Sequence, residues 1–530
     1  MSEYEMTKTD VLIVGAGPAG LTLACDLARR GVAFRIVERD LMPNTASKAK
    51  GIQSRSLEVL DDLGAVDYVV RTGIADLPMW FHDEHGTTVE HPSITVPAKD
   101  SFHTPYPNLL WIGQFDVEHA LRERLADFGG AVEWGVEALD LTQDEGGVTV
   151  TLRAPQGERT VRARYVVGTD GGKSTIRKLI GLTLNGETHE EQRFYLGDVT
   201  VADLRRDHAH VWTSDKGMLI LTPLPNTQNW QLQCLIPAGA ATQTPSLDFY
   251  QQLLDERGAG VRLTGASWLS VYRVNVRMVD DYRSGRVFLA GDAAHVHSPA
   301  GGQGMNTGIQ DAYNLGWKLA AVLTGTKPQL LDTYAAERIP VARKVLAIST
   351  EKYQNTADQA EGGIDVVTTA LTQLADDSLT SGLGIRYRTG PASHETDRLG
   401  AGDRAPNAIG LIGPDRTVDV FDLLRGPQWN LLAFDAQMPV VTDLAMPEHL
   451  HVHRINSTKG SGIFDADGEF QRIYAARPGE LILVRPDGYL ATRASGDDAA
   501  ALIKRLRVLV HDQQIHRPLD VRQPAAHHLS

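Results

Sequence analysis

The most constraining feature of this sequence is a glycine-rich turn between an apolar run and a helical pattern near the N-terminus. The run Asp10–Val14 is typical of a buried parallel strand. The turn Gly15–Gly20 follows it, and apolar residues then recur at helical spacing until Gly31. A second apolar run, 33–37, ends at Glu38. This order of strand, turn, helix and strand predicts a βαβ unit.

The glycines of the turn fit a phosphate-binding role. Gly15 allows the tight turn, Gly17 lets backbone N–H groups approach a pyrophosphate, and Gly20 permits close packing of helix on strand. A carboxylate at Glu38 accepts ribose hydroxyls and repels a 2′-phosphate, so FAD or NAD fits this site and NADP does not. We therefore predict an adenine dinucleotide here, with a bare βα turn as the alternative.

A second acidic residue, Asp292, lies far along the chain and favours FAD over NAD as the ligand. The apolar run Val287–Ala290 predicts a strand that ends at Asp292, and open α/β sheets bind ligands at that edge. The ribityl chain of FAD carries hydroxyls that need such an acceptor, whereas NAD has no ribityl chain. A long helix is predicted from about Met305, and its dipole would stabilise negative charge on a reduced flavin. FAD is thus favoured, and the alternative is that Asp292 caps a turn.

Composition excludes several other classes of protein. The chain has 530 residues, 42% of them hydrophobic and 22% charged, as in ordinary globular proteins. Its net charge of −14 argues against binding to nucleic acid or to an anionic membrane. Two cysteines cannot form a disulfide framework, and His295-x-His297 lacks further metal ligands, so we expect structural hydrogen bonds there and no metal. Without a signal peptide or a long apolar run, a cytoplasmic protein is expected.

Three separated motifs resemble those of the class A flavoprotein monooxygenases, the single-component aromatic hydroxylases with the 4-hydroxybenzoate hydroxylase fold. The first combines Gly291–His295 with Gly301–Asn306, and the second is the segment 311–319. The third is the segment Val167–Gly171 with Ser174 and Arg177 beyond it. The motifs occur in the family's order and spacing, and the resemblance covers about residues 10–343.

The turn and the resemblance together imply a set of FAD contacts. Lys48 stands where many relatives have arginine, and lysine lacks the planar fork of that side chain. The predicted cofactor-binding residues are Gly15, Gly17, Pro18, Ala19, Gly20, Glu38, Arg39, Lys48, Gln114, Val136, Asp170, Asp292, Pro299, Gly302, Gly304, Met305 and Asn306.

Two segments of the C-terminal part, Gly402–Pro406 and Val484–Tyr489, resemble the thioredoxin-like extension of the phenol and polyketide hydroxylase branch. The C-terminal part contains no CxxC, so it cannot perform thiol–disulfide chemistry, and a packing or homo-oligomer role is expected. The predicted fold class is α/β, with a Rossmann-like FAD-binding domain interleaved with an antiparallel-sheet substrate domain. The expected boundaries are 1–185 and 282–375 (including a helical segment after 330) for FAD binding, 186–281 with part of 75–108 for substrate, 376–400 as linker, and 401–530 for the thioredoxin-like domain.

The resemblance implies a two-stage reaction. NADPH or NADH reduces FAD, and reduced flavin takes O2 to form a C4a-hydroperoxide that hydroxylates an electron-rich ring. No second GxGxxG follows a strand, which favours transient docking of the nicotinamide nucleotide. Baeyer–Villiger oxygenation and epoxidation on the same fold stay open, as does a non-catalytic FAD-binding partner protein.

The substrate is expected between the flavin and the antiparallel sheet. Met218, Ile220 and Thr222 alternate along one strand and share a face, and Trp212 and Trp230 are near in sequence. Plain sheet core is the alternative for these five residues. Our register places Leu224 where 4-hydroxybenzoate hydroxylase has a carboxylate-binding arginine, which favours a larger, apolar phenol such as a polyketide-derived polycycle. We assign no catalytic base.

Overall fold

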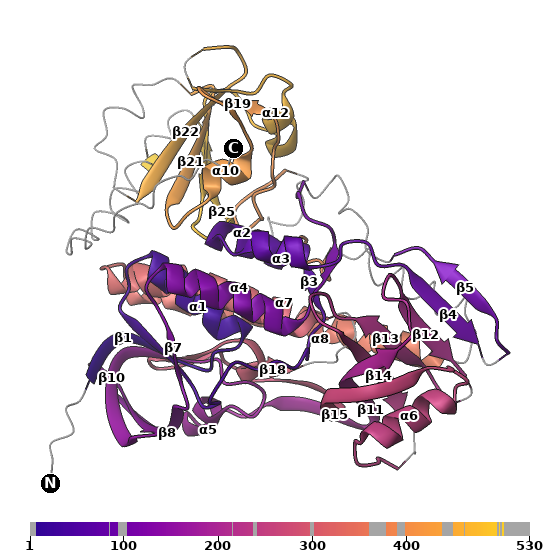
Figure 1. The fold of residues 1–530 in the computed structure, drawn as a ribbon. Coiled ribbons are helices and arrows are strands. Elements are labelled where there is room, and N and C mark those ends of the chain that lie inside the picture. The colour runs from indigo at the N-terminus through magenta and orange to yellow at the C-terminus, as the bar shows by residue number, and fades with distance from the viewer. Residues whose placement is uncertain are drawn as a thin grey trace, which may run out of the picture.

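The structure is a computed structural model whose described residues form three large sheets and one two-stranded sheet. Figure 1 shows how the large sheets are arranged. The structure confirms the predicted α/β class with an additional antiparallel sheet. The described residues are 7–83, 85–93, 103–214, 216–236, 241–296, 302–359, 378–388, 398–436, 449–460, 462–495, 498 and 501–502. Pro299 and, within the expected linker 376–400, the residues 376–377 and 389–397 therefore lie outside the described residues.

The first sheet contains the predicted βαβ unit. Strand β1 pairs in parallel with β2 on one side and β10 on the other, and β17 continues the sheet beside β10. The inner residues of these strands, such as Val11–Val14 of β1 and Val287–Leu289 of β17, are apolar and buried because helices cover the sheet. The strands are β1 (Thr7–Val14), β2 (Phe34–Glu38), β7 (Val132–Trp134), β8 (Glu137–Asp144), β9 (Gly147–Ala154), β10 (Gly157–Gly168), β16 (Arg283–Ser284) and β17 (Val287–Leu289).

Helices α1, α4 and α7 lie over this sheet and separate it from the C-terminal part of the chain (Figure 1). The long helix that the sequence predicts from about Met305 begins two residues earlier, as α7 (Gln303–Leu323). The helices are α1 (Pro18–Arg29), α2 (Ser54–Leu63), α3 (Val66–Thr72), α4 (Gln114–Asp127), α5 (Thr175–Leu179), α7 (Gln303–Leu323) and α8 (Asp332–Gln359), with 3-10 turns η2 (Gly291–Ala293) and η3 (Pro328–Leu331).

The second sheet is almost entirely antiparallel and has the order β18-β15-β11-β14-β13-β12-β4-β5. One face packs on α6 (Leu247–Asp255) and forms a separate apolar core. The strands are β4 (Met79–Asp83), β5 (Thr88–His91), β11 (Asn185–Ala202), β12 (Ala209–Thr213), β13 (Leu219–Pro223), β14 (Asn229–Ile236), β15 (Arg262–Met278) and β18 (His295–Val296); a small separate ladder pairs β3 (Gly51–Gln53) with β6 (Leu109–Trp111).

The C-terminal part has its own sheet of order β20-β19-β23-β22-β21-β24-β25 and its own core. It docks on α2, α7 and α8 through buried polar contacts, such as Arg485 on Glu337 at 2.7 Å. The elements are β19 (Leu411–Ile412), β20 (Thr417–Val418), β21 (Trp429–Phe434), β22 (Leu450–Asn456), β23 (Ile463–Phe464), β24 (Glu480–Val484), β25 (Leu490–Ser495), α10 (Val420–Leu424) and α12 (Glu469–Tyr474).

The segment before this part is packed where it is described. Ile385 and Tyr387 are buried against Val341 and Val345 of α8 and against Tyr489. Within the described residues, no helix combines the length and apolar character that crossing a membrane requires.

Candidate flavin and substrate site

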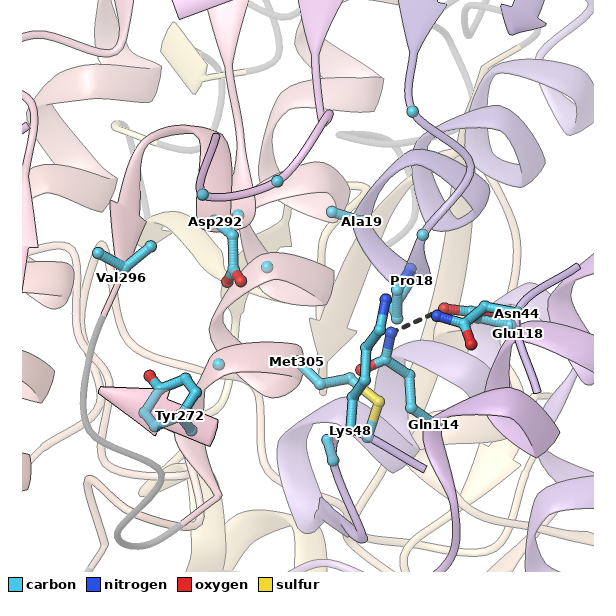
Figure 2. A pocket seen from close by; sticks show the side chains of 18 of the residues that line it. Pro18, Ala19, Asn44, Lys48, Gln114, Glu118, Tyr272, Asp292, Val296 and Met305 are labelled. Atoms are coloured by element: carbon cyan, nitrogen blue, oxygen red, sulfur yellow. Dashed lines mark hydrogen bonds between the residues drawn. The ribbon is translucent and has the colours of Figure 1, made fainter. Parts of the chain in front are cut away.

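A single elongated cavity of about 930 Å³ joins the carboxyl ends of the first sheet to one face of the second sheet. In Figure 2, Asp292 and Tyr272 lie on one side of it, and Lys48, Gln114 and Glu118 lie on the other. Its volume is at the upper end of the usual range for ligand sites, about 300–1,000 Å³. The cavity therefore has room for an extended ligand.

The glycine turn closes one end of the cavity, and each glycine has a distinct environment. Gly15 has a φ of +107°, and a Cβ there would lie 2.5 Å from the carbonyl oxygen of Thr169. A Cβ on Gly20 would lie 2.0 Å from the carbonyl oxygen of Gly15, so this position must stay bare for α1 to pack on the strand. A Cβ on Gly17 would meet nothing within 4 Å, because Gly17 faces the cavity.

Glu38 ends β2 beside this turn. Its Oε2 accepts a hydrogen bond from the backbone N–H of Ala16 at 2.8 Å, and its Oε1 accepts one from Asp40 at 3.1 Å. The carboxylate thus holds the glycine turn and lines the cavity at the same time. Val136, which also lines the cavity, donates its backbone N–H to the carbonyl oxygen of Glu38 at 2.8 Å.

Asp292 lies in the turn η2 directly after β17, and its side chain is exposed to the cavity. Asp311 holds this turn by accepting the backbone N–H of Gly291 at 3.2 Å. Nε2 of His295 donates to the same carboxylate at 2.7 Å, which confirms the structural role expected for this histidine. Among the described residues, no cluster of three or more His, Cys, Asp or Glu could hold a metal ion.

Asp170 lines the cavity but also caps a helix. Its Oδ2 accepts the backbone N–H groups of Thr175 at 2.6 Å and Ile176 at 3.2 Å. Arg177 of this helix donates to the carbonyl oxygens of Ala293 at 2.9 Å and Gly172 at 2.8 Å. The segment around Asp170 is thereby joined to the turn that carries Asp292.

The opposite wall carries a polar group of three side chains. Nε2 of Gln114 donates to Oε1 of Glu118 at 2.8 Å (Figure 2), and Lys48 lies beside them. Burial raises the pKa of Glu118, although Gln114 and Lys48 partly oppose this shift. Lys48 itself has a φ of 36°, a backbone conformation that non-glycine residues rarely adopt.

Most of the predicted FAD contacts are brought together on the walls of this cavity. Among the predicted residues that the structure describes, two do not line it. Gly20 lies behind the turn. The side chain of Asn306 is buried, where it accepts the N–H of Gln53 at 2.9 Å and donates to the carbonyl oxygen of Gly302 at 2.8 Å. The side-chain amide of Asn306 joins β3 to α7, and a contact of this residue with the cofactor stays a prediction. The residues on the walls are Gly15, Gly17, Pro18, Ala19, Glu38, Arg39, Lys48, Gln114, Val136, Asp170, Asp292, Gly302, Gly304 and Met305.

The predicted substrate residues divide between the two faces of the second sheet. Met218, Ile220 and Thr222 line the cavity, as expected. Trp212 and Trp230 do not: both pack in the apolar core on the other face, where the alternation of β14 directs Trp230. The expectation that they line the pocket is corrected.

Leu224 also differs from its expected place. It follows the end of β13, is buried, and is not among the cavity-lining residues. The absence of an arginine at position 224 therefore says nothing about how the substrate binds. The polar groups of the cavity come from neighbouring strands instead. Lining residues that sequence reasoning missed include Lys50, Trp111, Phe194, Gln231, Gln233, Trp268, Ser270, Tyr272, Asn275 and Arg277.

The residues present fit FAD. Gly17 leaves open space beside the N-terminus of α1, and no side chain of the described residues caps that terminus, so its N–H groups are available to a pyrophosphate. Glu38 and Asp292 stand at separate strand ends on the same edge of the first sheet, as the hydroxyls of an extended dinucleotide require. The fold and the site together define a flavin-binding α/β protein with a second, antiparallel sheet.

Comparison with known proteins agrees with this class. Residues 8–349 match the family described as FAD binding domain, and the chain belongs to that family. It is 38% identical to a flavin-dependent monooxygenase of Mycobacteroides abscessus, over 91% of this chain and 96% of that protein. It is 34% identical to 6-methylpretetramide 4-monooxygenase of Streptomyces rimosus, over 95% and 94%. The chain is a flavin-dependent monooxygenase with FAD as cofactor.

Solved structures show the same fold over nearly the whole chain. A ternary complex of aklavinone-11 hydroxylase with FAD and aklavinone has a TM-score of 0.79 and 27% identity, and the match covers 96% of this chain and all (100%) of that one. The flavin-dependent monooxygenase PieE with FAD and substrate also has a TM-score of 0.79, at 25% identity, covering 95% and 99%.

Proposed function

We propose that this monooxygenase uses NADPH or NADH and O2 to hydroxylate a phenolic ring that is part of a polycyclic, polyketide-type molecule. The observation that carries the proposal is the continuity of the cavity, which runs from the glycine turn to an apolar wall that includes Phe194, Met218 and Ile220. A flat aromatic ligand would bury its faces on such a wall, and the few polar groups would orient it.

One further observation supports the substrate class, and a separate one supports the expected compartment. The curated relatives include proteins named for 6-methylpretetramide and for pentachlorophenol, and a structural neighbour was solved with aklavinone. The buried, unpaired Cys25 and Cys234 suit a reducing cytoplasm.

FAD, when bound, supplies hydride acceptance from the nicotinamide and oxygen activation. The chain's own contribution is positional: Asp292 and the N-terminus of α7 hold one part of the cofactor, and the second sheet covers the ring of the substrate and keeps water out. Among the described residues, one glycine-rich nucleotide turn follows a strand, which supports transient docking of the nicotinamide nucleotide.

The test is consumption of NADPH and NADH by the FAD-loaded protein with a panel of simple and polycyclic phenols. We expect a polycyclic phenol to raise both reductant oxidation and O2 uptake, with a product heavier by one oxygen. Product structure distinguishes ring hydroxylation from Baeyer–Villiger oxygenation and epoxidation. No stimulation by any member of the panel would contradict the proposal.

A further inference from the structure

Lys50 is a cation on the second-sheet side of the cavity, next to the residues that would contact the substrate. Its Nζ donates to Oγ1 of Thr222 at 3.0 Å and to Oε1 of Gln233 at 3.4 Å. The same Nζ lies 5.9 Å from the ring centroid of Trp111. All four residues line the cavity, and the three neighbours of Lys50 are neutral.

Lys50 forms no ion pair with any described residue, unlike Lys318, which contacts Glu337 at 2.8 Å. An ammonium group that is removed from water without a counter-ion is costly. Burial accordingly lowers the pKa of Lys50 to about 8. A purely structural bridge between the two sheets could use an uncharged side chain at this position, so the charge points to a ligand.

We propose that Lys50 is the counter-ion for an oxyanion on the aromatic ring of the substrate, and that it holds a ring hydroxyl as the phenolate. This inference rests on the proposed function, and it assigns the group that orients and activates the substrate. An ammonium has three N–H donors, and Thr222 and Gln233 accept two of them. The third is directed to the ligand oxygen.

The proton balance of this step needs no additional reactant. When Lys50 is neutral, the ring hydroxyl transfers its proton to Nζ, the O–H bond breaks and an N–H bond forms. When Lys50 is charged, it binds a substrate that is already ionised. Both routes give one ammonium–phenolate pair.

The surroundings make this pair effective. Trp111, Met218 and Ile220 are apolar neighbours on the cavity wall, and a charge pair is stronger where water is excluded. A phenolate oxygen raises electron density at the ring carbons ortho and para to it, which are the carbons that an electrophilic oxygen attacks. Lys50 would thereby select both the substrate and the position that reacts.

The test uses the FAD-loaded protein and alizarin, a planar polycyclic phenol whose ionised form absorbs at longer wavelengths than oxidised flavin. The pH titration of bound alizarin reports its phenol pKa inside the protein. We expect binding to the wild-type protein to lower that pKa by at least one unit relative to free alizarin. Lys50→Met should abolish this shift and weaken binding at least tenfold, and Lys50→Arg should restore part of both.

Lys216→Met is the matched control, because Lys216 lies on the loop between β12 and β13, is exposed and is not among the residues that line the cavity. Alizarin bound to Lys216→Met should have the same phenol pKa as alizarin bound to the wild type. A measurement without variants compares alizarin with 9,10-anthraquinone, which has no ring hydroxyl, and we expect at least tenfold tighter binding of alizarin to the wild type.

Equal titration in wild type and Lys50→Met, or equal binding of the two probes, would overturn the role of Lys50 while leaving the aromatic-substrate proposal intact. Failure of the wild-type protein to bind either probe would contradict the substrate proposal and this inference together.

Discussion

Arg338 of α8 donates a hydrogen bond from Nε to Oδ1 of Asp311 on α7 at 2.7 Å, and both side chains are fully buried. The other carboxylate oxygen of Asp311 accepts from His295 and from the backbone of Gly291. Burial alone would raise the pKa of Asp311, but Arg338 and His295 outweigh it and hold this pKa below its ordinary value. The turn that carries Asp292 is therefore positioned by a buried ion pair behind it.

Removal of Arg338 should disturb both stability and cofactor binding. Arg338→Met leaves the carboxylate of Asp311 with a weaker set of partners, and breaking a buried pair costs about 3–5 kcal/mol. We expect a loss of this size in urea unfolding, together with release of FAD, measured by flavin fluorescence. Lys344→Met, at an exposed position of the same helix, should change stability by less than about 0.5 kcal/mol.

Gly17 and Gly20 should respond differently to the same added methyl group. At Gly20 the new Cβ meets the carbonyl oxygen of Gly15 at 2.0 Å, so Gly20→Ala should destabilise even the cofactor-free protein by about 1–3 kcal/mol or more. At Gly17 the Cβ enters open space in the cavity, so Gly17→Ala should keep the stability of the apoprotein and weaken FAD binding at least tenfold. Thermal unfolding without FAD and a flavin titration separate the two effects. Similar stability losses in both variants would contradict this account of the turn.

The contact between Arg485 and Glu337 should make stability depend on acid pH. Burial opposes the shift, but the hydrogen bonds and charge of Arg485 lower the pKa of Glu337 to about 2. Because the pKa is lower in the folded state, the stabilisation is complete above about pH 4.5 and is lost as the pH falls toward 2. The loss amounts to at most about 3 kcal/mol. Urea unfolding from pH 6 downward should show this loss in the wild type and a flatter profile in Glu337→Gln.

Lys50 should make stability depend on pH in the alkaline range, and Lys50→Met should remove this dependence. Burial lowers the pKa of Lys50 from 10.5 to about 8, so the folded state binds fewer protons than the unfolded state between these values. Wild-type stability therefore rises with pH across this window. We expect Lys50→Met to be more stable than wild type below pH 8, by at most about 3 kcal/mol, and this difference to disappear toward pH 10.5. A difference independent of pH would contradict a desolvated charge at this position.

The first sheet and the glycine turn could be predicted because their signals are local. The spacing of Gly15, Gly17 and Gly20 after an apolar run is typical of a dinucleotide-binding turn between a strand and a helix. Asp292 could be placed as well, since a strand end in an open α/β sheet delivers its residue to the ligand edge.

The substrate side could be predicted only in part, because it depends on which face of each strand meets the cavity. On β14, Gln231 and Gln233 face the cavity and Trp230 faces the apolar core. The alternation in the sequence shows that these residues lie on opposite faces, but it does not show which face lines the cavity. Lys50 has no motif at all: its role arises because β3 pairs with β6 and brings Nζ to Thr222, which lies 172 residues away in the chain.

The proposed reaction inserts one atom of O2 into a phenolic, polycyclic molecule. It is tested by the mass of the product that the FAD-loaded protein forms with NADPH or NADH and a polycyclic phenol under ¹⁸O2. We expect a product with one added ¹⁸O on the ring, formed only when reductant is present. Hydrogen peroxide as the sole product with every phenol in the panel, or a new oxygen that carries no label, would contradict it.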